Sequence, residues 1–466
     1  MKRILILLTA LLLMLTVFLA ACDNTATESS DAEGVVSSES SKTEESKKDP
    51  EASKAESKPE EESSESVEES EAESEGESFE TAKLPTEYKE GELNIEAASF
   101  SEKPYFVIVG RCNVGATVSA EVNGTTVSSK SYQGWYSVRV KATGSYANVR
   151  LTQSVDGEVV GSALEYKIKP VTPSADMWPV VAGGDFQFFF QKMLPDFKGA
   201  NIPNKLSLDN LKVRTQNRVK ALKEVNPNAE IIYLLVPSAM SVYPELVPEQ
   251  YKQASGDTKY DLIAQQLEAG GATVIDLKGA FAEHKNDEIP LYYKLDSHWS
   301  DYGAFIAYTE LFEHISEQFP AAAPRAFDEF DWNEGYRNSG DMTYYLAMSQ
   351  SKIKEYTYYR TFKDSVSVNP SIKSVPRYVS ENKLTYHDSM TYENTVGNYK
   401  PNLPKCIVMR DSYSTQLYDI LAERTYSTHY MGMWGYRWDK AQIQSESPDY
   451  VIYVLAEWNL DAILNG

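Results

Sequence analysis

Two short motifs carry residue types that together can perform acyl chemistry on a serine. They are Lys294-Leu295-Asp296-Ser297-His298-Trp299 and Arg410-Asp411-Ser412-Tyr413-Ser414. A serine hydroxyl is a weak nucleophile until a base takes its proton, and histidine is the usual base near neutral pH. A carboxylate commonly holds that histidine in one tautomer. Ser412, His298 and Asp296 are therefore candidates for a nucleophile, its base and the carboxylate that orients the base.

Each motif also has a purely structural interpretation. An Asp or Ser between an apolar run and a helix often caps the helix, and for Ser412 taken alone this interpretation is the stronger one. Asp-x-His pairs such as Asp296 and His298 also arise by chance. The other histidines are weaker candidates for the base, because two lie in polar helix-like segments, one in an aromatic stretch and one beside an aspartate (His284, His314, His429 and His387).

Metal binding is a second option for such residues. His387-Asp388 could join His298 in a metal site, but the chain has no cysteine spacing typical of metal ligands. We therefore expect no metal and no other cofactor. Cys112 and Cys406 both lie in apolar, strand-like patterns, and we expect them to be buried free thiols rather than a disulfide.

Apolar strands alternate with helices in the segment that contains both motifs. Strands are predicted over 230–236, 273–277, 405–409 and 449–455, and helices over 258–269 and 302–319. This alternation predicts an α/β fold with a doubly wound parallel sheet, whose active sites lie beyond the carboxyl ends of the strands. Ser412 would then start a helix, where its own backbone N–H could stabilise an oxyanion. The Tyr-rich stretch from about 324 to 404 has no clear periodicity.

A different pattern of short strands occupies residues 85–170. Strands are predicted over 105–110, 117–122, 125–129, 135–140, 147–153 and 163–168, with hairpin turns at Asn123-Gly124 and Asp156-Gly157. This regularity indicates an all-β, immunoglobulin-like sandwich. It has no cluster of acids, histidines or serines, so we interpret it as a spacer, with a glycan-contact module as the alternative. A connector containing proline leads into the α/β part, predicted over 177–466.

The chain begins with the pattern of a signal peptide. Lys2 and Arg3 precede an apolar run over 4–19 that is too short for a stable membrane span. The run ends in Leu19-Ala20-Ala21-Cys22, which resembles a lipobox. Residues 1–21 are therefore predicted to be removed, and Cys22 to carry a lipid that anchors the protein to the membrane. The alternative is a soluble secreted protein in which Cys22 is incidental.

Residues 22–84 are rich in Ser and Glu and almost free of large apolar residues, which predicts a disordered tether. From Asp23 to about Ala82, about 21 acidic and about 5 basic residues account for about −16 of the formal net charge of −23. Since no basic patch is present, we expect no nucleic-acid partner. A long tether suits the extracellular face of a Gram-positive membrane, from which an anchored domain must reach outward.

The α/β part resembles the SGNH-like O-acetyltransferases typified by AlgX and AlgJ of alginate biosynthesis, and the related Gram-positive DHHW proteins. The strongest match is residues 291–303 (LYYKLDSHWSDYG), which resemble the family's Y-x-x-D-T-H-W-[ST]-x-x-G signature. Weaker matches are the opening segment 181–185, the stretch 233–247, Gly340-Asp341-Met342, Asp411-Ser412-Tyr413-Ser414 and Ser447-Pro448-Asp449. The resemblance covers nearly all of the chain after about Met177.

By this resemblance Ser412 is the nucleophile, His298 the base and Asp296 its orienting carboxylate, with the Asp-x-His pair before the serine as in the family. Further candidates to line the site are Arg437, Tyr413 and Trp299. The sequence also departs from the family pattern. A glycine that often opens the serine motif is Arg410 here, and the opening segment, Asp185-Phe186-Gln187-Phe188, lacks the usual second glycine.

The resemblance implies a cell-surface enzyme that moves an acetyl group through an acyl-serine to an extracellular polysaccharide. In the family a membrane-bound O-acyltransferase (MBOAT) delivers the acetyl group, and we expect such a partner beside the lipid anchor. A first alternative is a carbohydrate esterase, a deacetylase that uses the same three residues with water as acceptor. A second is a non-catalytic glycan-binding lipoprotein, against which the presence of all three residues counts.

Overall fold

The computed structural model describes residues 89–177, 179–364, 394–432 and 438–465, all within one compact unit. The predicted signal peptide, Cys22 and the tether lie outside the described residues, as do His387-Asp388 and Arg437. No helix of the described part is long and apolar enough to cross a bilayer.

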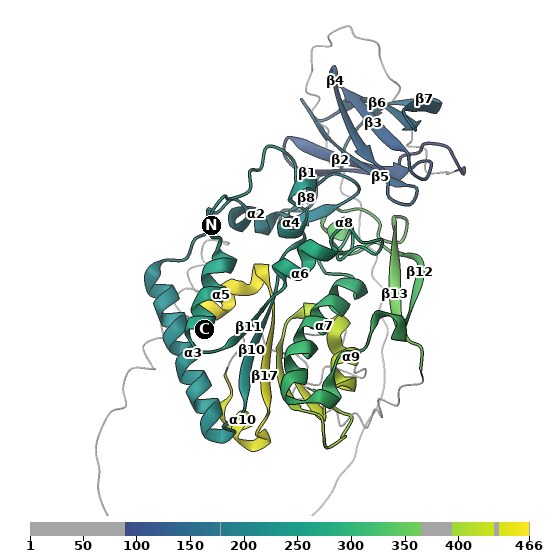
Figure 1. The fold of residues 1–466 in the computed structure, drawn as a ribbon. Coiled ribbons are helices and arrows are strands. Elements are labelled where there is room, and N and C mark those ends of the chain that lie inside the picture. The colour runs from purple at the N-terminus through teal and green to yellow at the C-terminus, as the bar shows by residue number, and fades with distance from the viewer. Residues whose placement is uncertain (1–88, 178, 365–393, 433–437, 466) are drawn as a thin grey trace, which may run out of the picture. The chain divides into compact units, whose positions relative to one another are not determined.

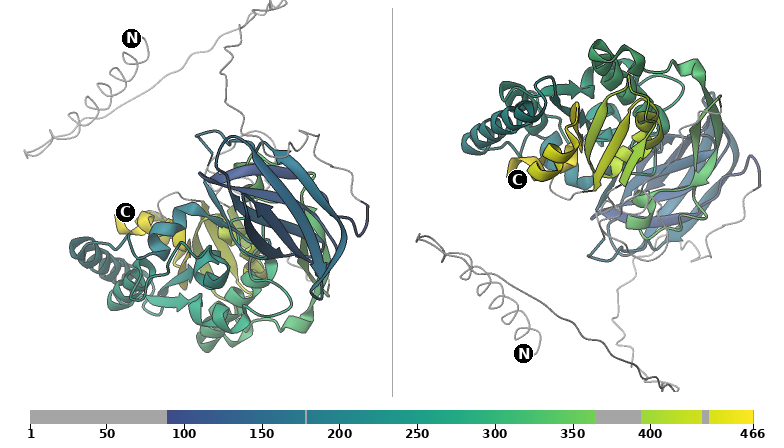
Figure 2. Two further views of the ribbon diagram at one scale, coloured as in Figure 1. Left: turned by 90° about the horizontal axis from the view of Figure 1, so that it is seen from above. Right: turned by 90° about the horizontal axis from the view of Figure 1, so that it is seen from below.

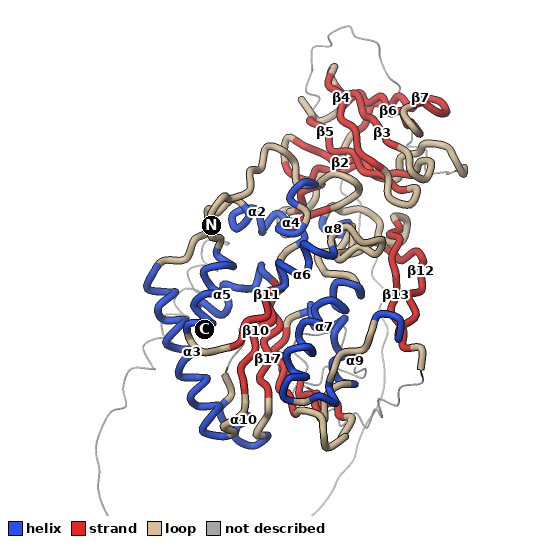
Figure 3. The backbone as a smooth tube through the Cα atoms, viewed as in Figure 1, coloured by secondary structure: helices blue, strands red, loops and turns tan. Residues whose placement is uncertain are grey.

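The N-terminal described part consists of two antiparallel sheets, with strand orders β1-β2-β5 and β4-β3-β6-β7. Figure 3 shows these strands in red. Side chains from both sheets, among them Phe106, Val118 and Val138, enclose one hydrophobic cluster. The predicted all-β part is thus present as two layers, while its immunoglobulin-like type stays a prediction. The strands are β1 (Ala97–Glu102), β2 (Tyr105–Arg111), β3 (Thr117–Val122), β4 (Thr125–Lys130), β5 (Trp135–Lys141), β6 (Ala147–Val155) and β7 (Glu158–Ile168).

Both predicted hairpin turns are confirmed. Asn123 and Gly124 have φ angles of 51° and 74° and connect β3 to β4. Asp156 and Gly157, with φ angles of 52° and 86°, connect β6 to β7. Two successive residues with positive φ are what a type I′ turn requires.

A six-stranded sheet forms the centre of the second part, in the order β11-β10-β17-β15-β16-β14. Every neighbouring pair is parallel except β14 with β16. The predicted doubly wound parallel sheet is confirmed, with one antiparallel edge strand added. The strands are β10 (Glu230–Val236), β11 (Thr273–Asp276), β14 (Asn394–Gly397), β15 (Lys405–Arg410), β16 (Ser427–Gly432) and β17 (Tyr450–Ala456).

Helices cover both faces of this sheet, as Figure 1 shows. In β10, Ile231 and Leu235 point into the cluster on one face, and Ile232 and Leu234 into the cluster on the other. A strand buried on both faces reads as a continuous apolar run, which is why the sequence predicts β10 well. On one face lie α3 (Lys205–Val225), α5 (Lys259–Ala269), α10 (Lys440–Glu446) and α11 (Leu460–Asn465), and on the other α6 (Leu277–His284), α7 (Asp301–Gln318) and α9 (Tyr418–Glu423).

Some elements were not predicted. In α3 only Leu211, Thr215 and Leu222 are buried, so its apolar stripe is weak. The Tyr-rich stretch contains β12 (Phe330–Asn338), α8 (Asp341–Tyr345) and β13 (Lys354–Phe362). Strands β12 and β13 pair antiparallel from end to end, and we call them the β12–β13 ribbon.

One hydrophobic cluster joins the two parts. It combines Val107 and Trp135 of the strand-rich part with Phe186 and Leu295 of the α/β part. The rings of Trp135 and Phe186 stack with centroids 6.4 Å apart. Figure 2 shows the strands of the strand-rich part, in purple and blue, from two further sides. The same cluster includes residues of β8 (Val180–Ala182), β9 (Phe188–Phe190), η1 (Gln191–Met193), α2 (Leu194–Phe197), α4 (Ala239–Val242) and α8.

Because the two parts share a core, we expect them to unfold together. Trp135→Ala should lower the free energy of unfolding of the whole described unit by about 3–5 kcal/mol, since it opens a cavity between the parts. Calorimetry should show one transition at a lower temperature. Tyr146→Ala, at a residue 40% exposed in the same part, is the control and should change little. Two separate transitions, with only one moved by Trp135→Ala, would contradict the shared core.

Candidate active site

Asp296, His298 and Ser412 form one hydrogen-bonded row. His298 Nε2 lies 2.7 Å from Ser412 Oγ, and His298 Nδ1 lies 2.8 Å from Asp296 Oδ1. The side chains remain partly accessible, with 24% of His298 and 12% of Asp296 exposed. If Nδ1 carries the proton and donates to Asp296, Nε2 is free to accept the proton of the serine. The row therefore has the geometry of a nucleophile, a base and an orienting carboxylate.

The turn after β15 presents Ser412 at the carboxyl end of the sheet. Asp411 caps this turn, because its Oδ1 accepts from the backbone N–H of Tyr413. Its Oδ2 accepts from the N–H of Ala456 and from Asn459 Nδ2, both at 2.9 Å. The cap that the sequence offered as an alternative for Ser412 is thus supplied by Asp411. Ser412 is the first residue of the 3-10 helix η5 (Ser412–Leu417).

The other two members of the row lie on a tight loop, residues 291–300, which we call the His298 loop. Tyr292 and Trp299 pair across it in an antiparallel bridge. Ser300 then caps α7 by accepting from the N–H groups of Tyr302 and Gly303. A Cβ at Gly303 would lie 2.3 Å from the carbonyl oxygen of Leu291, so the glycine of the motif permits this close approach.

Tyr413 and Trp299, the predicted lining residues, are buried under the row. They are 1% and 0% exposed. The Tyr413 ring lies 5.1 Å from the His298 ring, and its hydroxyl donates to the Ser297 carbonyl. Trp299 Nε1 donates to the Tyr413 carbonyl at 2.9 Å. Through these hydrogen bonds, the two side chains connect the motif that contains His298 to the motif that contains Ser412.

The structure shows the surroundings of the two residues that depart from the family pattern, Arg410 and Phe186. Arg410 is 2% exposed and interacts electrostatically with Tyr430 and Asp411, while burial lowers the pKa of its guanidinium. Phe186 has a φ of 64°, in the left-handed region that glycine adopts readily and bulky residues rarely do. The chain therefore keeps a glycine-like backbone at Phe186, and burial of the ring against Trp135 offsets the strain.

Three further residues contact the row or the adjacent Ser297, and the sequence does not predict them as site residues. Arg337 Nη2 lies 3.1 Å from Asp296 Oδ2. Asp341 accepts from the Ser297 N–H at 2.8 Å and from the Ser297 hydroxyl at 2.5 Å. A Cβ at Gly340 would lie 2.2 Å from Asp296 Oδ2. The resemblance of Gly340-Asp341-Met342 to a family motif could have identified Gly340 and Asp341. No sequence motif includes Arg337.

The charges around the row favour a charged His298. Burial alone would lower the pKa of His298, but its hydrogen bond to Asp296 and the negative charge of Asp296 outweigh burial, so the pKa is raised. Burial would likewise raise the pKa of Asp296, but the hydrogen bond and charge of His298, with the charge of Arg337, lower it. The lowered pKa of Asp296 favours its ionised form, which would stabilise a proton on His298.

Asp296, His298 and Asp341 also offer atoms within 4.8 Å of one another that could ligate a metal ion. The hydrogen bonds of these residues account for the arrangement without one. His298 Nδ1 is bonded to Asp296, and Arg337 faces the other oxygen of Asp296, where it would repel a cation. We therefore interpret the cluster as a hydrogen-bonded network.

A carboxylate partner does not by itself identify the base. Each of the other described histidines also lies within 3.0 Å of a carboxylate oxygen, in the pairs His284–Asp287, His314–Glu230 and His429–Glu446. Among the described histidines, the 2.7 Å contact with Ser412 Oγ distinguishes His298.

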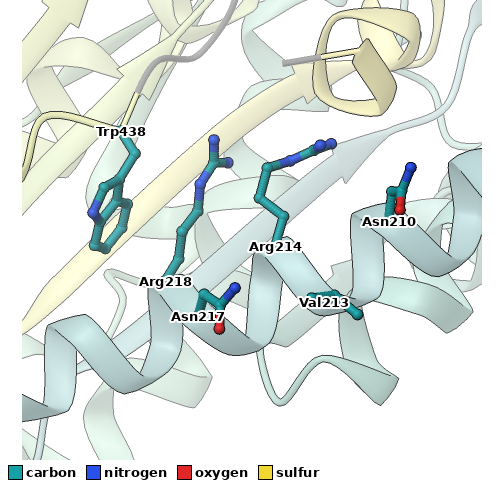
Figure 4. Close-up of a pocket in the computed structure, with 6 residues that line it drawn as sticks. All are labelled: Asn210, Val213, Arg214, Asn217, Arg218 and Trp438. Carbon is teal, nitrogen blue, oxygen red and sulfur yellow. The ribbon is translucent and has the colours of Figure 1, made fainter. Parts of the chain in front are cut away.

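Two hollows differ in their relation to the row. One of about 560 Å³ opens beside Asp296 and is lined by Asp296, Arg337, Asn338, Ser339, Gly340, Asp341, Tyr344 and Gln350. The other, of about 290 Å³, lies between α3 and Trp438, and Figure 4 shows Arg214 and Arg218 projecting from the helix there. No residue of the row lines this second hollow, so it is separate from the candidate site.

Comparison with known proteins adds a family match. Residues 205–373 match the family described as SGNH hydrolase-like domain, acetyltransferase AlgX. This segment contains Asp296 and His298 but ends before Ser412. The predicted resemblance to that family is confirmed over these residues, and it supports an acyl-transferring enzyme of the SGNH-like type. Among curated protein sequences, none matches the chain.

Several solved structures are similar at low sequence identity. The O-acetyltransferase domain of AlgJ from Pseudomonas putida is 17% identical with a TM-score of 0.39, covering 60% of this chain and 91% of that one. For PatB1 from Bacillus cereus the values are 18%, 0.42, 62% and 97%. For a DHHW family protein from Eubacterium siraeum they are 14%, 0.36, 67% and 92%. At these TM-scores, the similarities do not by themselves establish a common fold or activity.

The packing of Gly340 gives a sharp test of the site. Gly340→Ala places a methyl group on Asp296 and should displace it from His298, lowering acylation of Ser412 by about 100-fold, as small misplacements of catalytic groups do. Gly335→Ala on β12 is the matched control, because its added methyl meets nothing closer than 4.0 Å. The measurement is the acylation rate with an activated acetyl ester. Equal rates for the two variants would contradict the described contact.

Proposed function

We propose that this protein is an SGNH-type O-acetyltransferase that uses Ser412 as its nucleophile. The observation that carries the proposal is the row from Asp296 through His298 to Ser412, with contacts of 2.8 and 2.7 Å. The family match over residues 205–373 supports the same class of chemistry.

In the first half-reaction, His298 Nε2 takes the proton of Ser412 as Oγ attacks the carbonyl carbon of an acetyl donor. The tetrahedral intermediate collapses, the bond to the leaving group breaks, and the leaving group receives the proton from His298. In the second half-reaction, His298 takes the proton of an acceptor hydroxyl, whose oxygen attacks the acetyl-serine ester. The acetyl ester of the acceptor leaves, and Ser412 regains its proton from His298.

The oxyanion of each intermediate needs hydrogen-bond donors placed in advance. The N–H of Tyr413 is already bonded to Asp411. Ser412 begins η5, and N–H groups of a first helical turn have no partner within the helix. We assign the backbone N–H of Ser412 as one oxyanion donor.

We further propose an extracellular polysaccharide as the acceptor. The hollow beside Asp296 has guanidinium and amide groups together with Tyr344, which is 52% exposed. Planar polar groups beside an aromatic face suit a sugar ring. The hollow meets the row at Asp296 rather than at Ser412, so it would hold a neighbouring sugar unit and not the hydroxyl that takes the acetyl group.

The location and the donor belong to the same proposal. A lipid on Cys22 would hold the enzyme at the extracellular face of the membrane. An MBOAT protein in that membrane would supply the acetyl group. The tether over residues 22–84 would let the enzyme reach an acceptor outside.

The function is tested by trapping the acyl-enzyme. Incubation with p-nitrophenyl acetate should add one acetyl group to Ser412, seen by peptide mass spectrometry, and adding oligosaccharides should yield acetylated sugar. Ser412→Ala should abolish the adduct, and Asp296→Asn should slow its formation by about 10³–10⁴-fold because the wrong tautomer is favoured. Ser414→Ala, at the buried neighbouring serine, is the control. If Ser412→Ala forms the adduct like wild type, the proposal fails. If the acyl-enzyme releases acetate and no acetylated sugar forms, the esterase alternative is favoured.

The pH dependence has a definite sign. Only neutral His298 can accept the serine proton, so the acylation rate should rise with pH as His298 loses its proton. Because the pKa of His298 is raised, the midpoint should lie above the ordinary value of about 6.5 for histidine. Asp296→Asn removes the charge responsible and should move the midpoint to lower pH. A midpoint unchanged by Asp296→Asn would contradict this assignment.

A further inference from the structure

Two charged residues that face each other across the β12–β13 ribbon both contact the His298 loop. Arg337 on β12 lies directly opposite Glu355 on β13. Arg337 bonds the Asp296 carboxylate at 3.1 Å. Glu355 accepts from the backbone N–H groups of Lys294 and Leu295. The pair therefore holds the backbone just before Asp296 as well as its side chain.

The contacts run along consecutive residues. Besides Asp296, Arg337 packs over the ring of Tyr293, with its guanidinium carbon 4.2 Å from the ring centroid. Together, Arg337 and Glu355 touch every residue from 293 to 296. This stretch leads directly into His298, so any shift of the ribbon would move the base relative to Ser412.

Burying the ionisable carboxyl group of Glu355 at this position costs folding free energy. Its side chain is 0% exposed, and burial raises its pKa to about 7 despite the nearby charge of Arg337 and the two N–H groups. The charge of Asp296 adds to the increase, and Lys294, Tyr132, Tyr293 and Tyr359 also face the carboxyl group. Apolar residues commonly stabilise such positions at least as well as buried charges do. Fold stability alone therefore does not explain the pair.

We propose that Arg337 and Glu355 are positioning residues that keep the His298 loop in its reactive geometry. This inference rests on the proposed function, because it assumes that Ser412 is acylated. Arg337 occupies Oδ2 of Asp296, which leaves Oδ1 turned toward His298 Nδ1. Glu355 fixes the backbone on which Asp296 is carried.

The test compares radical and conservative variants in Ser412 acylation by p-nitrophenyl acetate. Arg337→Met and Glu355→Ala should lower kcat by about 10- to 100-fold with little change in KM, because they misplace the base. Glu355→Gln keeps an oxygen that accepts from both N–H groups and should stay within about threefold of wild type. Arg337→Lys keeps the charge beside Asp296 and should stay within about 10-fold of wild type.

The pH profile separates positioning from a purely structural role. The groups that act on His298 are Asp296, Asp341 and Asp411, and Arg337 offsets the charge of Asp296. Without Arg337 the imidazolium is better stabilised, so Arg337→Met should move the midpoint of the acylation profile to higher pH, and Arg337→Lys should not. A structural defect would lower the rate equally at every pH.

Asn333→Ala is the matched control, since Asn333 bonds Thr361 at 3.0 Å on the exposed far end of the ribbon; it should acylate like wild type. If Ser412→Ala is inactive but Arg337→Met and Glu355→Ala keep the wild-type rate and midpoint, the inference is wrong and the proposed function stands. If Ser412→Ala is as active as wild type, the function itself fails. If the radical variants do not fold, the acylation rates of Glu355→Gln and Arg337→Lys provide the test. A rate more than about 10-fold below wild type in either of them would overturn the inference.

Discussion

The hydrogen bond between His298 Nε2 and Ser412 Oγ is the contact on which the rest of the site depends. It spans 2.7 Å and joins residues 114 positions apart in the chain. In the proposed reaction neither residue acts without the other, because the serine needs a base and the histidine needs a proton to take. The central sheet makes the contact possible by placing the turn after β15 at its carboxyl end, where the His298 loop enters α7.

The His298 loop is held from several directions at once. The N–H of Phe188 in β9 donates to the Lys294 carbonyl at 2.8 Å, and Gln187 donates to the Tyr293 carbonyl at 3.1 Å. The N–H of Met342 in α8 also bonds the Leu295 carbonyl, at 3.3 Å. A short loop with so many fixed backbone groups can hold a base within the small tolerance that acyl transfer requires.

This support extends into the strand-rich N-terminal part. Trp135 of β5 packs on Phe186, next to Gln187, which bonds the His298 loop. From its strand pattern we interpret that part as a spacer. Its shared core with the α/β part adds a second role, because removing it would expose the apolar residues that hold the β8–β9 hairpin in place. The glycan-contact alternative stays a prediction.

The sequence predicts the sheet well and the site in part, for physical reasons. Strands such as β10, buried on both faces, are unmistakable apolar runs, and the Asp296-x-His298 spacing is local. The bonds of Asp411 Oδ2 to Ala456 and Asn459 and the contact of Arg337 with Asp296 depend on register and long-range packing, which no local pattern encodes. The resemblance to the family drew attention to Gly340 and Asp341 but did not explain why residue 340 is a glycine. The structure explains it, because Asp296 lies too close to Gly340 for a larger side chain.

The tautomer of His298 in solution shows whether this histidine can take the proton of Ser412. Nitrogen-15 NMR of the imidazole, above the pKa of His298, should show a protonated Nδ1 and an unprotonated Nε2, with the Nε2 signal moved by Ser412→Ala. That result places the acceptor nitrogen against the serine, as acylation of Ser412 requires. A protonated Nε2, or an Nε2 signal that Ser412→Ala does not move, would mean that His298 cannot take the serine proton and is not the base.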